Sequence, residues 1–101
     1  MRECQFLIPY AKLAPGIPGL VEAKLLALCG GFTGPSYTAG AWVSPQGRVV
    51  REASVRYIVA TDNPAALVSF LGGLCKTLGE ECIYFSNGGE VTLIPPSTEV
   101  A

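Results

Sequence analysis

Two runs of apolar, β-branched and aromatic residues, separated by a four-residue turn, most constrain how this chain can fold. The turn is Ser44-Pro45-Gln46-Gly47, with Pro early and Gly last, which is typical of a hairpin with a type I turn. The strand that follows is the best defined, because two sets of side chains alternate along it: Val55, Tyr57 and Val59 on one face, and Glu52, Ser54 and Arg56 on the other. The middle of the chain is therefore predicted to be an antiparallel hairpin.

Helical patterns precede and follow this hairpin. The apolar spacing predicts one helix over residues 19–29, with Leu20, Val21, Leu25 and Leu28 on its inner face and Glu22 on its wet side. A second helix begins at Asn63-Pro64, where Asn63 or Asp62 is the expected N-cap. Its apolar stripe consists of Leu67, Leu71, Leu74, Cys75 and Leu78.

Strands are predicted at both ends of the chain, over residues 4–10, 81–86 and 90–94, and Asn87-Gly88 joins the last two in a tight hairpin. The order is β-α-β-β-α-β with one added C-terminal strand. We expect a single domain over residues 1–96, followed by a disordered tail over residues 97–101.

Composition limits the function. Half of the residues are apolar, 15% are charged and the net charge is −1, which argues against nucleic acid as a partner because such binding needs clustered Lys and Arg. A surface so poor in charge favours association, so we expect a homo-oligomer, with a dimer as the first guess. No signal peptide or membrane span is recognisable, which predicts a cytoplasmic protein without a membrane partner.

Four cysteines lie in separate apolar runs, and the chain contains no His. Cys4, Cys29, Cys75 and Cys82 are expected to be reduced, buried, small hydrophobic residues rather than disulfides or metal ligands. No nucleophile stands beside a base in any motif, so no catalytic residue, metal or cofactor is predicted.

The candidate ligand-binding residues are Trp42, Glu52, Ser54, Arg56 and Tyr57. If the helices cover the Val55 face of the strand, Glu52, Ser54 and Arg56 lie on the open face of the sheet. There Glu52 and Arg56 form either a charge pair or part of a pocket, and the sequence leaves open which face Trp42 occupies. The glycine-rich segment 30–36 is interpreted first as a helix C-cap with an irregular strand, and second as a ligand-lining loop.

This order of elements resembles the ferredoxin-like α+β sandwich, in which two helices pack on one face of an antiparallel sheet. More narrowly, Trp42, Gly47, Arg51-Glu52 and Ser54 resemble a Trp-x4-Gly-x3-Arg-Glu-x-Ser pattern of small bacterial ferredoxin-like families of unknown function. A second similarity is to PII-like signalling proteins, although residues 44–47 leave only a tight turn where those proteins carry a long loop.

Two functions compete at this stage. The first is a non-catalytic, self-associating module that binds a small ligand or a protein. The alternative is a cofactor-free enzyme of the dimeric α+β-barrel type, with a pocket at the sheet face that uses Glu52 and Arg56.

Overall fold

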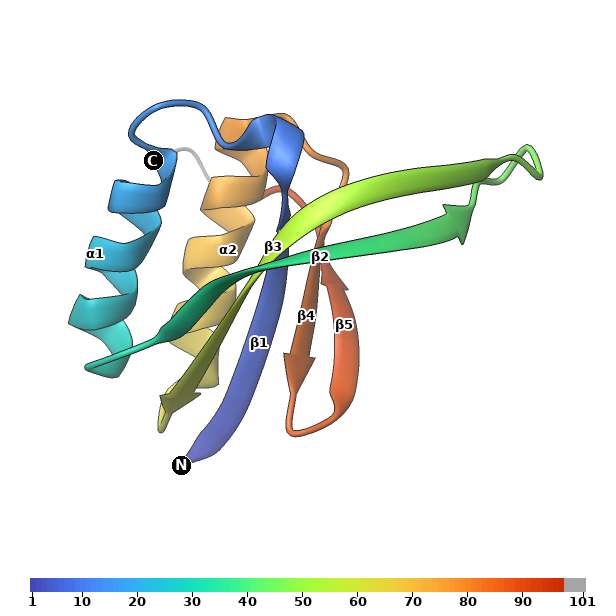
Figure 1. Ribbon diagram of the computed structural model, residues 1–101. Coiled ribbons are helices and arrows are strands. Elements are labelled where there is room, and N and C mark those ends of the chain that lie inside the picture. Colours follow the sequence, from blue (N-terminus) through green and yellow to red (C-terminus); the bar gives the residue numbers. More distant parts are fainter. Residues whose placement is uncertain (98–101) are drawn as a thin grey trace.

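Both helices lie on one face of a five-stranded antiparallel sheet, and the other face is open (Figure 1). The computed structural model describes residues 1–97, so the predicted tail lies outside the described residues except for Ser97. In chain order the elements are β1 (Arg2–Pro9), a 3-10 turn (Tyr10–Lys12), α1 (Ile17–Cys29), β2 (Thr33–Val43), β3 (Val49–Thr61), α2 (Pro64–Leu78), β4 (Ile83–Asn87) and β5 (Glu90–Ile94). The predicted α+β class and element order are confirmed.

The sheet order is β2-β3-β1-β4-β5, and every neighbouring pair is antiparallel. β3 lies between β1 and β2, so the chain crosses over the sheet through α1 before the hairpin returns to pair with β1. The C-terminal hairpin extends the sheet on the other side of β1. The long β2–β3 hairpin and the short β4–β5 hairpin therefore flank β1.

The core lies between the sheet and the helices. Alternate residues of β1 and β3 point into it and are buried, as strand periodicity requires: Cys4, Phe6 and Ile8, with Val55, Tyr57 and Val59. The predicted stripe of α2 is confirmed, since Leu67, Leu71, Leu74 and Cys75 are buried and Leu78 packs against the cluster. On α1 the core residues are Val21 and Leu25, whereas Leu20, predicted to face inward, is 55% exposed.

Local sequence signals fix the element ends as predicted. The Asn63 side chain accepts a hydrogen bond from the Ala66 amide and so caps α2. Gly47 N–H donates to the Ser44 carbonyl oxygen at 2.8 Å, which closes the four-residue turn of the long hairpin. Asn87 pairs with Glu90 around a two-residue turn in which Gly88 and Gly89 both have positive φ.

Gly72 makes a contact that the sequence does not reveal. Its nearest neighbours are Pro95 and Ser97 of the C-terminal segment. The Ser97 amide donates to the Gly72 carbonyl oxygen at 2.9 Å. A Cβ added at Gly72 would lie at ordinary van der Waals distance from this segment, 3.6 Å from the Pro95 carbonyl oxygen.

The β2–β3 hairpin extends beyond the rest of the sheet. β1 pairs with β3 only from Ser54 to Thr61, while β2 continues to pair with β3 as far as Val43 and Val49. Residues 39–43 and 49–53 therefore have no third strand beside them, and we call them, with the turn between, the arm. Five residues of strand project by roughly 17 Å, and Figure 1 shows the arm running past β4 and β5, away from the helices.

Among the described residues, no helix is long and apolar enough to cross a membrane.

Candidate functional site

The predicted polar residues of β3 lie on the open face of the sheet. Tyr57 and its alternate neighbours point toward the helices, so Glu52, Ser54 and Arg56 point the other way. Ser54 and Glu52 are half-buried and Arg56 is exposed. The expected placement of these three side chains agrees with the structure.

Trp42 joins them on this face, which answers the question that the sequence left open. Its indole Nε1 donates to Glu52 Oε2 at 3.2 Å. Trp42 pairs with Val50 and Gly40 pairs with Glu52, so the indole and the carboxylate are diagonal neighbours on one side of the hairpin. The space opposite Glu52 is open, since a Cβ added at Gly40 would meet nothing within 4 Å.

Glu52 and Arg56 do not form the charge pair considered from the sequence. Four residues of strand separate their Cα atoms by about 13 Å, which is too long for a direct pair along one face. Within residues 1–97 the salt bridges join the N-terminal amine to Asp62 at 3.2 Å and Lys12 to Glu80 at 3.9 Å. The Glu52 carboxylate is instead held by the Trp42 indole, which leaves the Arg56 guanidinium exposed on the same face.

Tyr57 lies apart from the other four predicted site residues, in the core on the opposite face. Its hydroxyl donates to Glu22 Oε2 of α1 at 3.0 Å. Its ring stacks on Phe6 with 5.5 Å between ring centres and meets the edge of Phe32 at 5.9 Å. Burial, and after it the hydrogen bond and charge of Glu22, raise the pKa of Tyr57 well above its usual value. Glu22, assigned to the wet side of its helix, is half-buried in this contact.

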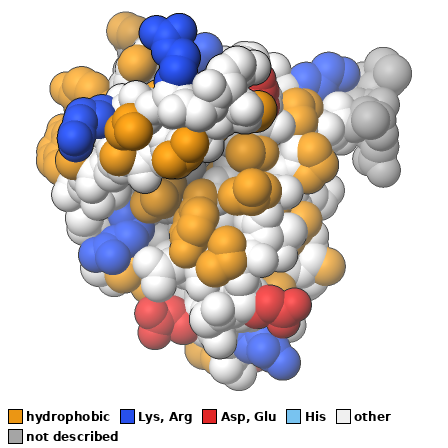
Figure 2. Space-filling view, turned by 90° about the vertical axis from the view of Figure 1, so that its right-hand side faces the viewer, with side chains coloured by type: hydrophobic (Ala, Val, Ile, Leu, Met, Phe, Trp, Pro, Cys, Tyr) orange, Lys and Arg blue, Asp and Glu red, His pale blue; other side chains and the backbone are white. Residues whose placement is uncertain are grey.

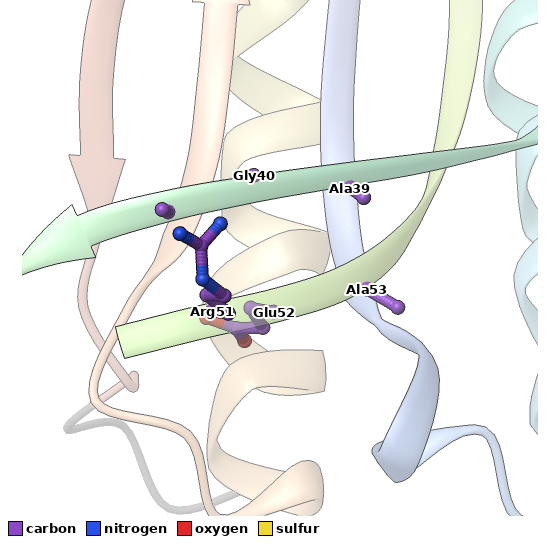
Figure 3. Close-up of a pocket in the computed structure, with 6 residues that line it drawn as sticks. Ala39, Gly40, Arg51, Glu52 and Ala53 are labelled. Atoms are coloured by element: carbon purple, nitrogen blue, oxygen red, sulfur yellow. The ribbon is translucent and has the colours of Figure 1, made fainter. Parts of the chain in front are cut away.

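A wide hollow of about 440 Å³ lies along the arm, and Glu52 borders it while Trp42 does not. Figure 3 shows that short side chains border it on both strands, with Arg51 and Glu52 adding the charged groups. The residues around it are Ala39, Gly40, Ala41, Arg51, Glu52 and Ala53. Its walls come from one hairpin, so within a single chain it is a recess open to solvent.

A second hollow, of about 430 Å³, lies near the N-terminus and includes part of the glycine-rich segment. Gly30 ends α1 in the left-handed conformation, as the C-cap interpretation predicts. Gly30, Gly31, Phe32 and Thr33 border the hollow together with β3 residues Ile58 to Ala60. Ser36 pairs in the β2–β3 ladder instead, after an irregularity between Thr33 and Ser36.

The four cysteines are free thiols in the structure, with Cys4 and Cys75 buried and Cys29 and Cys82 half-buried. Burial is the main cause that raises the pKa of the Cys4, Cys75 and Cys82 thiols above the usual value. These three thiols are protonated at neutral pH, so they do not supply a thiolate nucleophile. No group of three or more His, Cys, Asp or Glu side chains within residues 1–97 is arranged to hold a metal.

The apolar character of the open face beyond the arm is a feature that sequence reasoning missed. Tyr84, Val91 and Leu93 are 40%, 53% and 59% exposed there. The sequence carried a signal for this surface, because side chains of a strand point alternately to its two faces. Ile83, Phe85 and Ile94 occupy the buried face, so the apolar residues between them must lie on the open face.

Known proteins were compared with the chain at three levels. No protein-family model matches it, and no curated protein matches it in sequence. Among solved structures it is similar to a phage SAM lyase in the apo state, with a TM-score of 0.52 and 16% sequence identity, over 98% of this chain and 92% of that chain. At this identity the likeness concerns the fold alone.

Proposed function

We propose that this chain is a ferredoxin-like, small-molecule-binding enzyme whose ligand site is the open-face cluster of Trp42, Glu52 and Arg56. The ligand class is that of SAM, S-adenosylmethionine, a sulfonium cation that carries an adenine ring and an amino acid. The observation that carries the proposal is the Trp42–Glu52 pair, an exposed indole whose Nε1 lies 3.2 Å from a carboxylate oxygen. The likeness of the fold to a phage SAM lyase indicates the ligand to test first.

The chemistry of the cluster fits such a ligand. An indole attracts a cation to its face and stacks with aromatic rings, and a carboxylate beside it adds a full opposite charge. Arg56 is exposed farther along the same face and suits a ligand carboxylate, which a guanidinium binds through two parallel hydrogen bonds. A ligand with a central cation and a terminal carboxylate therefore meets complementary charge along this face.

A lyase reaction requires one further role from these residues, that of a base. When the C–S bond of a sulfonium breaks, its electron pair moves to sulfur and a cation becomes a neutral thioether. In an elimination, the pair of a neighbouring C–H bond forms the new double bond and a base accepts the proton. Glu52 is the carboxylate placed for that role, and Trp42 holds it in position.

The same proposal separates into a catalytic and a non-catalytic form. The hollow beside Glu52 is bordered by one hairpin and is open to solvent, which favours a binding module without catalysis. Binding of SAM without product would support this second candidate, whereas formation of a neutral thioether would support the enzyme.

Calorimetric titration with SAM and with S-adenosylhomocysteine, its neutral thioether analogue, tests the proposal. The wild type is expected to prefer the sulfonium, and Glu52→Gln, which keeps the side-chain size, is expected to lower that preference about tenfold, or ~1.4 kcal/mol. Glu90→Gln is the matched control, because Glu90 is an exposed glutamate at the start of β5. Equal affinities for the two ligands, or an unchanged preference in Glu52→Gln, would contradict the proposed site.

Chromatography of the same mixtures after incubation measures turnover. A thioether product that forms with the wild type and not with Glu52→Gln supports the catalytic form.

A further inference from the structure

The turn between β4 and β5 begins with Asn87-Gly88, a thermolabile side chain followed by an unhindered neighbour. In such a pair the backbone nitrogen of the glycine can attack the side-chain amide carbon of the asparagine, because glycine has no Cβ to obstruct the approach. The chain has one other asparagine, Asn63, but Pro64 follows it, and the proline nitrogen carries no hydrogen and cannot react in this way. Asn87 is therefore the asparagine of this chain that can cyclise.

This reaction needs only water as a co-reactant. The Gly88 nitrogen gives up its proton and forms a bond to Asn87 Cγ, and the Cγ–Nδ2 bond breaks so that the side-chain nitrogen leaves as ammonia. Water then opens the resulting cyclic imide. Attack of water at Cγ leaves an ordinary aspartate, whereas attack at the backbone carbonyl carbon routes the chain through Cγ and adds one atom to the backbone.

The fold restrains both reacting groups at Asn87. The Gly88 N–H donates to the Glu3 carbonyl oxygen of β1 at 2.9 Å, so the attacking nitrogen is engaged. Asn87 Oδ1 is buried and accepts no hydrogen bond from the described residues. Cyclisation places negative charge on this oxygen, and that charge is not stabilised where neither water nor a donor is beside it. The reaction therefore requires this end of β4 to leave β1.

A short contact attaches the β4–β5 hairpin to the rest of the sheet. β1 pairs with β4 at three positions, the last of which joins Cys4 to Asn87, whereas β1 pairs with β3 at eight. On its outer side the hairpin buries little, because Tyr84, Val91 and Leu93 stay exposed. Figure 2 shows hydrophobic side chains at the surface on this side of the molecule. Opening of so limited a contact costs less free energy than unfolding of the whole chain.

We infer that Asn87 is a modification site, at which spontaneous deamidation is slowed by the pairing of β4 with β1 and proceeds when that pairing opens. Its product weakens the same pairing. Asn87 alternates with Ile83 and Phe85 on the buried face of β4 and pairs with Glu90, so a carboxylate at this position is poorly hydrated and opposite a like charge. The longer backbone of the second product also displaces the register with β5. Because ammonia is lost, the change persists after the hairpin closes.

Peptide mapping of the full chain tests the site. Trypsin cleaves after Lys and Arg, so Asn63 lies in the peptide 57–76 and Asn87 in the peptide 77–101, and one digest reports on both. Deamidation gives the mass gain that replacement of NH2 by OH brings. In a denaturing concentration of urea we expect this gain in the peptide 77–101 at least about tenfold faster than in the folded protein, because only open molecules react. The peptide 57–76 serves as the internal control and should not change.

The dependence of the rate on urea tests the role of the β1–β4 pairing. Below the unfolding transition, the rate should rise less steeply with urea than the unfolded fraction does, because opening one hairpin exposes less surface than unfolding the chain. No mass gain in the peptide 77–101, or equal rates with and without urea, would overturn the inference. A rate that follows the unfolded fraction would place the reaction in the unfolded chain and would overturn the role of the pairing.

Aspartate variants test the effect of the product. Asn87→Asp is expected to lower the urea midpoint of unfolding. Asn63→Asp is the matched control and should keep the wild-type midpoint, because Asn63 caps α2 and Asp caps a helix as well as Asn does. Deamidated wild type, separated by anion exchange through its added charge, gives the same comparison without a substitution. A wild-type midpoint for Asn87→Asp and for the deamidated protein would contradict the weakening. No ligand takes part, so these results stand apart from the proposed function.

Discussion

The contact between Tyr57 and Glu22 makes a quantitative prediction about stability. Tyr57→Phe removes one oxygen atom and keeps the ring that stacks on Phe6 and meets Phe32. The lost hydrogen bond, 3.0 Å long, ends on a carboxylate, and such bonds contribute about 1.5–3 kcal/mol. Glu22 is half-buried and regains water in the variant, so we expect the lower end, a loss of about 1.5 kcal/mol in the free energy of unfolding near pH 8.

The same contact gives this loss a pH dependence. Burial and Glu22 raise the folded-state pKa of Tyr57, whereas the unfolded chain ionises near the usual value of 10.0. Above that pH the unfolded state holds fewer protons than the folded state, so stability falls by up to about 1.4 kcal/mol per pH unit. The contribution is complete below pH 10 and is lost as the pH rises toward the folded-state pKa. The difference between wild type and Tyr57→Phe should therefore shrink toward zero near pH 11.

Urea unfolding, followed by circular dichroism at pH 8 and pH 11, measures both effects. All samples are compared at one protein concentration, because association would add to the apparent stability. Tyr37→Phe is the matched control, since Tyr37 is 75% exposed, and it should change stability by less than about 0.5 kcal/mol at either pH. A Tyr57→Phe difference that is equally large at pH 8 and pH 11 would refute the reasoning.

Three further substitutions test the packing of the fold by the same unfolding assay. Leu71→Ala should cost about 2–5 kcal/mol because Leu71 is fully buried, and a cost below ~0.5 kcal/mol would mean that α2 presents another face to the sheet. Gly73→Ala should stabilise the protein by about 0.5–1 kcal/mol, since an added Cβ meets nothing within 4 Å inside a helix; a loss would contradict the space found there. Gly34→Ala should cost at least about 2 kcal/mol, because its φ is +118° and the new Cβ would lie 2.5 Å from the Arg56 carbonyl oxygen. A neutral Gly34→Ala would show that β2 can shift away from β3.

Local elements followed from the sequence because their signals are local. The Ser44–Gly47 turn, the Asn87-Gly88 hairpin and the Asn63 cap each depend on a few consecutive residues whose backbone preferences point to one conformation. The stripe of α2 likewise follows from helical periodicity, because its buried residues recur every three or four positions. The alternation along β3 placed Glu52, Ser54 and Arg56 on one face before the structure showed which face it was.

The candidate site needed contacts between residues that are distant in sequence. Trp42 and its neighbour Val43 point to opposite faces of the strand, and both are apolar. The alternation of apolar and polar residues therefore did not show which face Trp42 occupies. Pairing with β3 sets its register and places its indole against Glu52. Glu22 is charged, as residues at surface positions usually are. Only the packing of α1 over β3 brings its carboxylate to the Tyr57 hydroxyl.

The sequence by itself therefore determined the elements, their order and the two faces of each strand, since these depend on backbone preferences and side-chain period. The tertiary structure alone decided which face the helices cover and where the sheet ends. β1 stops pairing at Pro9, opposite Ser54, while β2 and β3 continue to Val43 and Val49. That difference in strand length creates the arm and leaves it exposed on both sides, and no local pattern encodes it because it arises from the pairing of three strands.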